Sequence, residues 1–345
     1  MNQSSEHSSD DKVFHSRKRF MIPVCLLSSL IIISLTIIYS IRPDSFMAIT
    51  VYPIWVWTIP CLITLLLYGT IFTRQYFWIM VPFLALTYLI SDTPIALIRG
   101  LYQNRPPVTR AASSQSLRVI TLNCHDSAGA ILALAKYEPD IILIQETVSR
   151  DSLDKLRIKI FSEAGFSAWD PDVAILSKYP LEEIPAPFDF TGYCLPAKSR
   201  IPTESGTVEL LLVPVHLYAP PFRLDLWNPE CWQAYSQHRK LQRSQLNSVL
   251  KELPSHSLGS EVLIAGDFNA PPGDAIFSPL SSGMQDAFEE VGVGWGCTIA
   301  NQLPLIRIDQ CWSTPALKPI HCQAIPSEGS DHRAVLVDYK IDESD

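Results

Sequence analysis

The sequence predicts an α/β domain over residues 117–345, preceded by an apolar N-terminal region. Short apolar runs alternate with helical segments along residues 117–345, which is typical of α/β proteins. A chain of 345 residues also has room for one large domain and an appendage. The composition is uneven, because 47% of the residues are hydrophobic and only 18% are charged. This apolar content excludes a disordered or collagen-like chain.

The N-terminal third contains three uncharged stretches, at residues 20–41, 45–73 and 75–91. A helix that crosses a bilayer needs about 20 apolar residues. We therefore expect a basic tail at 1–19 and a transmembrane anchor at 20–98, with spans near 20–41, 46–70 and 76–98. The first stretch is longer than the apolar part of a signal peptide, which favours an anchor that is not cleaved.

Charge predicts the orientation of this anchor. Basic residues precede the first span and favour a cytoplasmic N-terminus: Lys12, Arg17, Lys18 and Arg19. Three spans then place the domain outside the cytoplasm, as in a multi-pass protein of the bacterial inner membrane. Two spans would reverse this placement, and Arg99, Arg105 and Arg110 favour the reverse. Residues 99–116 are rich in Ser and Pro and predict a linker.

Within the domain, six apolar runs predict strands, at 117–123, 140–145, 172–176, 208–216, 261–265 and 333–339. Three segments predict helices, at 128–137, 152–164 and 232–250. The domain contains 18 Lys and Arg residues and 30 Asp and Glu residues, a net charge of −12. This charge does not favour a broad contact with a duplex phosphate backbone.

Six cysteines lie in the domain, at positions 124, 194, 231, 297, 311 and 322. None forms a CxxC pair, which argues against a structural zinc site. Their even number suits disulfides in an oxidising compartment. Six buried thiols are an equally good explanation.

Polar side chains follow several of the apolar runs and precede the last predicted strand. The positions are Asn123, Glu146, His216, Asp267, Asn269, Asp309, Asp331 and His332. Oxygen ligands of these types suit Mg²⁺ or Mn²⁺, and a histidine beside a carboxylate can move protons at neutral pH. Each residue alone also has a structural explanation, such as a turn or a satisfied core histidine. Together they predict a site for metal-assisted hydrolysis of a phosphate ester.

These residues lie in six ordered blocks, TLN, QE, VHLYAP, GDFNAPP, RID and SDHRAV. In this order and spacing, residues 117–345 resemble the endonuclease/exonuclease/phosphatase superfamily, whose fold is DNase I-like. The resemblance is to a membrane-tethered, bacterial-type member. It implies a four-layer α/β sandwich, with two packed mixed β-sheets flanked by helices. It also implies hydrolysis of phosphoric ester bonds with Mg²⁺ or Mn²⁺ as cofactor.

The resemblance implies a metal site with Glu146 as the main ligand, Asn123 beside it and Asp331 as a further contributor. Several nucleases of the superfamily carry an Asp two positions after the Asn. Here His125 occupies that position, and Asp126 follows it. This departure puts a second metal ligand in doubt.

The resemblance also implies acid and base roles. Asp267 would orient or deprotonate the attacking water, and Asn269 would help to hold the phosphate or that water. His332, paired with Asp309, would contact the phosphate or act as a base. His216 would donate a hydrogen bond to a phosphate oxygen or assist the leaving group.

The expected function is therefore a membrane-anchored, metal-dependent phosphodiesterase. Its partners would be the bilayer and a phosphodiester substrate, either a phospholipid headgroup or a nucleic acid, with no obligate protein partner. The alternative is a catalytically silent, membrane-anchored binding module with the same fold. Trp227 and Trp232 are candidates for a substrate mouth, but packing in the core or on the surface is the better explanation.

Overall fold

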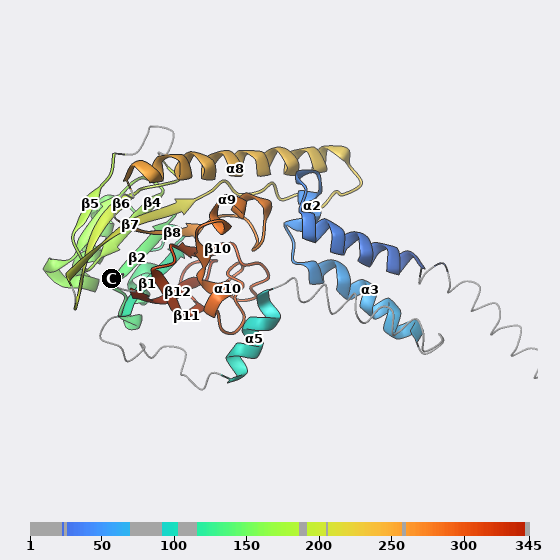
Figure 1. The fold of residues 1–345 in the computed structure, drawn as a ribbon, viewed down its shortest axis with the longest axis horizontal. Helices are drawn as coiled ribbons and strands as arrows, with labels where there is room; N and C mark the ends of the chain where they lie inside the picture. The colour runs from blue at the N-terminus through green and yellow to red at the C-terminus, as the bar shows by residue number, and fades with distance from the viewer. Residues whose placement is uncertain are drawn as a thin grey trace, which may run out of the picture. The chain divides into compact units, whose positions relative to one another are not determined.

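The computed structural model describes residues 23, 26–69, 92–102, 116–185, 192–204, 206–256 and 260–341 (Figure 1). The chain divides into two compact units, Met1–Ser91 and Asp92–Asp345. The second unit contains two β-sheets. The apolar runs that predict the strands contribute most of the core between them.

The first unit is helical where it is described. Residues 26–41 are helical, and η1 (Asp44–Phe46), α2 (Met47–Thr50) and α3 (Ile54–Gly69) follow. The expected span at 46–70 is interrupted at Pro53, which lacks an N–H group and disfavours helix at the residue before it. No helix in the described part of the chain is both long enough and apolar enough to cross a bilayer. The expected spans at 20–41 and 76–98 lie partly outside the described residues.

Helix α5 (Asp92–Tyr102) changes the expected boundary between anchor and domain. It belongs to the second unit, whereas the sequence predicts a span up to residue 98 and a linker at 99–116. Ala96 is buried in the core between the sheets. Arg99 donates hydrogen bonds to the carbonyl oxygens of Phe288, Glu289 and Gly292. These carbonyls lie at the end of α10 (Ala287–Val291), where a cation is favourable.

The domain contains two six-stranded mixed sheets. The first has the order β11 (Leu317–Ile325), β12 (Ala334–Ile341), β1 (Ser116–Asn123), β2 (Ile141–Gln145), β4 (Val173–Ser177) and β3 (Phe166–Trp169). The second has the order β5 (Leu181–Glu183), β6 (Ala197–Thr203), β7 (Gly206–His216), β8 (Glu261–Asp267), β10 (Asp309–Ser313) and β9 (Gln285–Asp286). Each sheet has one parallel pair near its centre, β1 with β2 and β7 with β8.

Helices cover the outer face of each sheet. Helices α6 (Ala128–Ala133) and α7 (Arg150–Phe161) pack on the first sheet, with the 3-10 turns η2 (Leu134–Tyr137) and η3 (Ser162–Ala164). The long helix α8 (Pro229–His256) packs on the second sheet, together with η5 (Ala275–Phe277) and α9 (Ser278–Ser281) (Figure 1). The expected sandwich of two mixed sheets between helices is therefore confirmed.

Strand β7 shows how alternation builds these layers. Leu210 and Leu212 enter the core between the two sheets. Leu211, Val213 and Val215 point the other way, into the core beneath α8. Successive side chains of a strand face opposite sides, so a strand that is covered on both sides is a continuous apolar run.

The strand register brings the polar strand ends to one edge of the sandwich. Asn123 at the end of β1 pairs with Gln145 at the end of β2. In the second sheet, Asp267 pairs with His216 on one side and with Asp309 on the other. The two parallel pairs therefore end beside the same site.

Candidate active site

A cavity of about 520 Å³ opens at this edge of the sandwich. Its polar lining is Glu146, Asp172, His216, Asp267, Asn269, Asp331 and His332. Both sheets contribute, because Glu146 follows β2, and His216 and Asp267 end β7 and β8. Glu146 and Asn269 adopt left-handed backbone conformations, with φ of 47° and 49°. Such strain in residues other than Gly is frequent at functional sites.

Asn123 joins the two carboxylates at the centre of the site. Its Nδ2 donates to Glu146 Oε1 at 2.9 Å and to Asp267 Oδ2 at 3.1 Å. His125 Nδ1 lies 3.1 Å from Glu146 Oε2. Burial raises the pKa of Glu146, but the hydrogen bonds from Asn123 and His125 outweigh it and lower the pKa below its usual value. Glu146 is therefore an anionic oxygen ligand that faces the cavity.

Asp267 and Asp309 are both buried, and His332 lies between them. His332 Nδ1 is 2.9 Å from Asp309 Oδ2, and its Nε2 is 3.8 Å from Asp267 Oδ2. Burial lowers the pKa of His332, but Asp309 and Asp267 outweigh it and raise the pKa to about 10. Burial and the neighbouring Asp309 raise the pKa of Asp267. His332 is therefore held in its protonated form between the two carboxylates.

Asp172 is a site residue that the sequence reasoning missed. Its Oδ2 lies 2.6 Å from His216 Nδ1. His216 Nε2 then faces Asp267 Oδ2 at 3.9 Å and Glu146 Oε1 at 4.0 Å. Burial lowers the pKa of His216, but the bond to Asp172 and the other carboxylates raise it overall. The only sequence signal is that Asp172 begins a predicted strand, and nothing in the sequence pairs it with His216.

Two expected residues lie in the cavity wall but contact neither Glu146 nor Asn123 through a described side-chain hydrogen bond. Asn269 Nδ2 donates to the carbonyl of Leu217 at 2.8 Å, and its backbone N–H donates to Asp267 Oδ1. Asp331 is exposed. The structure therefore brings Asn123, Glu146, His216, Asp267, Asp309 and His332 together, while Asn269 supports the neighbouring loop and Asp331 lies at the rim.

The donor set fits a hard divalent cation at Glu146. Among the described His, Cys, Asp and Glu residues, one group of three has ligand atoms within 4.8 Å of one another, Asp267, Asp309 and His332. That group is buried and already joined by a histidine–carboxylate hydrogen bond. Glu146 instead presents oxygen atoms to the cavity beside Asn123. Because Mg²⁺ prefers oxygen ligands and retains water, the Glu146 carboxylate suits such a cation, and Asn123 orients that carboxylate through its Nδ2.

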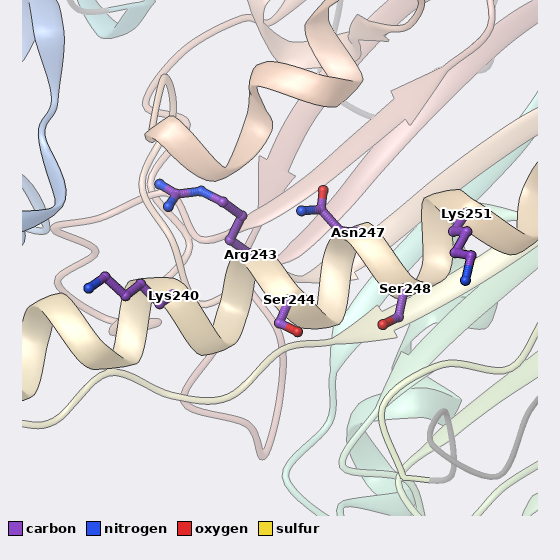
Figure 2. Close-up of a pocket in the computed structure, with 6 residues that line it drawn as sticks. All are labelled: Lys240, Arg243, Ser244, Asn247, Ser248 and Lys251. Carbon is purple, nitrogen blue, oxygen red and sulfur yellow. The ribbon is translucent and has the colours of Figure 1, made fainter.

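A second cavity, of about 410 Å³, lies on α8. Figure 2 shows its lining along one stretch of the helix: Lys240, Arg243, Ser244, Asn247, Ser248 and Lys251. It has neither a carboxylate nor a histidine in its lining, so it lacks a general base and a metal ligand. The chemistry therefore belongs to the cavity at the strand ends.

Comparison with known proteins identifies the family to which the domain is similar. Residues 120–332, more than half of the chain, match the sequence model of the Endonuclease/Exonuclease/phosphatase family. None of the curated proteins compared matches the chain significantly.

Two solved bacterial structures share the fold, and a third structure is reported beside them. The endonuclease/exonuclease/phosphatase from Bacteroides vulgatus has a TM-score of 0.51 at 14% identity, covering 66% of this chain and 99% of that one. An endonuclease/exonuclease/phosphatase family protein from Bacteroides thetaiotaomicron has a TM-score of 0.50 at 13% identity, covering 65% and 97%. Humanized D. rerio TDP2 has a TM-score of 0.48 at 18% identity, covering 66% and 99%. At these identities the likeness concerns the fold alone.

Proposed function

Because the chain belongs to the endonuclease/exonuclease/phosphatase family, we propose that it is a divalent-metal-dependent phosphodiesterase. The observation that carries this proposal is the convergence of Glu146, Asp267 and two histidine–aspartate pairs on one cavity. The products would be a phosphomonoester and an alcohol.

Glu146, with Asn123 beside it, would hold Mg²⁺ or Mn²⁺, which supplies charge stabilisation at a phosphate oxygen. Asn123 also fixes the Asp267 carboxylate through its amide. Asp267 would orient the attacking water and accept its proton as the new P–O bond forms. The raised pKa of Asp267 suits a base that works near neutral pH.

The two histidines face Asp267 through their Nε2 atoms, at 3.8 and 3.9 Å. These distances are longer than a hydrogen bond. Both Nε2–H groups can therefore donate to phosphate oxygens. His332, held protonated by Asp309, would neutralise the phosphoryl charge. His216, held by Asp172, would give its proton to the alcohol as the old P–O bond breaks.

The proposed site of action is a membrane surface. The uncharged stretches at 20–41, 45–73 and 75–91 support attachment of the chain to a bilayer. The basic tail at 1–19 supports a cytoplasmic N-terminus, and three spans would place the catalytic domain outside the cytoplasm.

The test uses the purified full chain in an uncharged detergent. Its turnover is measured with Mg²⁺, Mn²⁺ or EDTA against bis(p-nitrophenyl) phosphate, plasmid DNA, p-nitrophenyl phosphate and sphingomyelin mixed micelles. Glu146→Ala and His332→Ala are compared with Glu182→Ala, which removes an exposed carboxylate on β5. We expect metal-dependent turnover of a diester, reduced about 100-fold or more in both site variants.

The control should retain full activity. If the folded chain turned over none of the four substrates and Glu146→Ala did not change its Mn²⁺ affinity, the enzyme proposal would be wrong. The binding-module alternative would then be the better explanation.

A further inference from the structure

The loop that follows His216 carries large apolar side chains that point into solvent. Residues 217–228 connect β7 to α8. The exposed fractions are 91% for Phe222, 86% for Trp227, 65% for Leu224 and 59% for Tyr218. Isolated exposed apolar residues are ordinary, but a contiguous group beside a site indicates an interaction surface.

The backbone of this loop is fixed by α8. Tyr235 Oη donates to the carbonyl of Arg223 at 3.0 Å, and Trp232 Nε1 donates to the carbonyl of Leu226 at 2.8 Å. Gln242 Nε2 donates to the carbonyl of Tyr218 at 2.9 Å. The outward direction of the apolar side chains is therefore built into the fold.

The loop is continuous with the catalytic cavity. Leu217, Tyr218 and Ala219 line that cavity together with His216. Asn269 Nδ2, in the same wall, donates to the carbonyl of Leu217. A molecule that contacts the apolar loop therefore lies next to the groups that would cleave a phosphodiester.

The charges in the loop distinguish between two kinds of partner. Its one arginine, Arg223, forms two hydrogen bonds to Asp225, at 3.0 and 2.6 Å. Arg223 is thus engaged within the loop, and Leu224 offers no ring for base stacking. A surface that bound single-stranded nucleic acid would combine aromatic rings with available cations, whereas Trp, Phe and Leu without net charge suit the bilayer interface.

We infer that the 217–228 loop docks the catalytic cavity onto a phospholipid bilayer, with Phe222 and Trp227 entering its interfacial region. The substrate would then be a phosphodiester in a lipid headgroup of that surface. This inference rests on the proposed function for the reaction and on the loop itself for the docking. The uncharged stretches between residues 20 and 91 independently favour a bilayer as the surface within reach.

The test measures the depth of the loop in a membrane. Cys25 and Cys61 are replaced by Ser in the full chain, and the six remaining cysteines are buried. A nitroxide is attached at Phe222→Cys or Trp227→Cys, and the chain is reconstituted in phosphatidylcholine vesicles. The matched control is Ile158→Cys, an exposed apolar position on α7, which covers the other sheet. The unsubstituted background chain sets the residual labelling.

Collision of the nitroxide with oxygen and with a water-soluble nickel chelate gives its depth. We expect positions 222 and 227 to lie about 5–10 Å within the interface and position 158 to lie in water. Equal exposure of all three positions to the chelate would overturn the inference. Immobilisation of positions 222 and 227 by a single-stranded oligonucleotide, without insertion into vesicles, would overturn it in favour of nucleic acid.

The same measurement in a Glu146→Ala chain separates the inference from the proposed function, because depth does not require turnover. Turnover without insertion would contradict only the docking. Insertion without turnover of any phosphodiester would contradict only the proposed reaction.

Discussion

Asp309 determines how firmly His332 keeps its proton. The Nδ1–Oδ2 distance is 2.9 Å, and both groups are buried. We predict that Asp309→Asn lowers the pKa of His332 from about 10 toward its ordinary value of about 6.5. The measurement is an NMR titration of the imidazole in metal-free protein. If the pKa of His332 did not change in this variant, Asp267 and not Asp309 would be the residue that raises it.

The same pair predicts the pH dependence of stability. A histidine whose folded-state pKa is raised stabilises the fold below the unfolded pKa and loses that contribution as pH rises through the folded pKa. At pH 6, Asp309→Asn should therefore lower the free energy of unfolding by on the order of 3 kcal/mol. The loss should shrink as the pH approaches about 10. Urea unfolding at several pH values tests this, and an equal loss at all of them would contradict it.

Asp172 acts on the reaction through His216, which makes it a positioning residue. We predict that Asp172→Asn lowers turnover by about 10–100-fold, because the imidazole loses its orienting carboxylate. If His216 protonates the leaving group, an alkyl phosphodiester should lose more than bis(p-nitrophenyl) phosphate, whose leaving group needs no proton. Equal losses on both substrates would indicate phosphate binding in place of proton transfer. Asp172→Glu, which retains the carboxylate, should recover part of the activity.

At this scale, much of the site could be predicted from the sequence. Six of the expected residues lie at the first or last residue of a strand or within two residues of it, so the strand register contributes to their convergence. Asp172 could not be predicted, because its partner lies 44 positions away in the other sheet. Asp331 was expected at the metal, but its exposed position leaves that role a prediction.

Among the elements, β8 depends on a close approach that only glycine allows. Gly266 has a φ of 150°, and a Cβ atom there would lie 2.0 Å from the carbonyl oxygen of Val215 on β7. We predict that Gly266→Ala lowers the free energy of unfolding by about 2–3 kcal/mol, because the parallel pair must separate. Chemical denaturation measures the loss. Gly283→Ala, where a Cβ atom meets nothing within 4 Å, is the matched control.

Some of the strands can be predicted from the hydrophobic pattern of the sequence alone. Strands covered on both faces, such as β2 and β7, are long apolar runs and were expected close to their observed bounds. The strands that the pattern did not reveal contain polar residues and lack an uninterrupted apolar run: β3, β5, β6, β9, β10 and β11. Strand β11 contains a register shift between Pro319 and His321. The sequence predicts an anchor span for residues 92–98 and a linker for residues 99–102, because apolarity alone cannot distinguish a core-facing helix from a span.

In the whole molecule, two sheets with helices outside leave one edge where parallel strands end, and both the cavity and the 217–228 loop lie there. The layers follow from the double-sided apolar strands. The distribution of charge does not follow from the fold: the domain carries −12 overall, yet the cavity on α8 is lined by two Lys and one Arg. Neither the basic lining of the cavity on α8 nor the position of the 217–228 loop could be predicted from the sequence alone.

The cysteines give a test of the whole domain, since they are spread over the cores and the site. All six are buried, and none of them forms a disulfide in the described part of the chain. Burial raises the pKa of Cys124 to about 11 and raises the pKa of Cys194, Cys311 and Cys322 further. Because the thiolate is the reactive form, a chain with Cys25 and Cys61 replaced by Ser should react slowly with a thiol reagent at pH 8.

Unfolding should then release all six thiols together, since the clusters that bury them form one cooperative structure. Dithiothreitol should leave Tm unchanged, because stability does not depend on a cross-link. If several thiols of the native protein reacted rapidly with the reagent, the sandwich would have to open locally around them. A fall in Tm with reductant would instead indicate a disulfide among these cysteines, which the described structure does not contain.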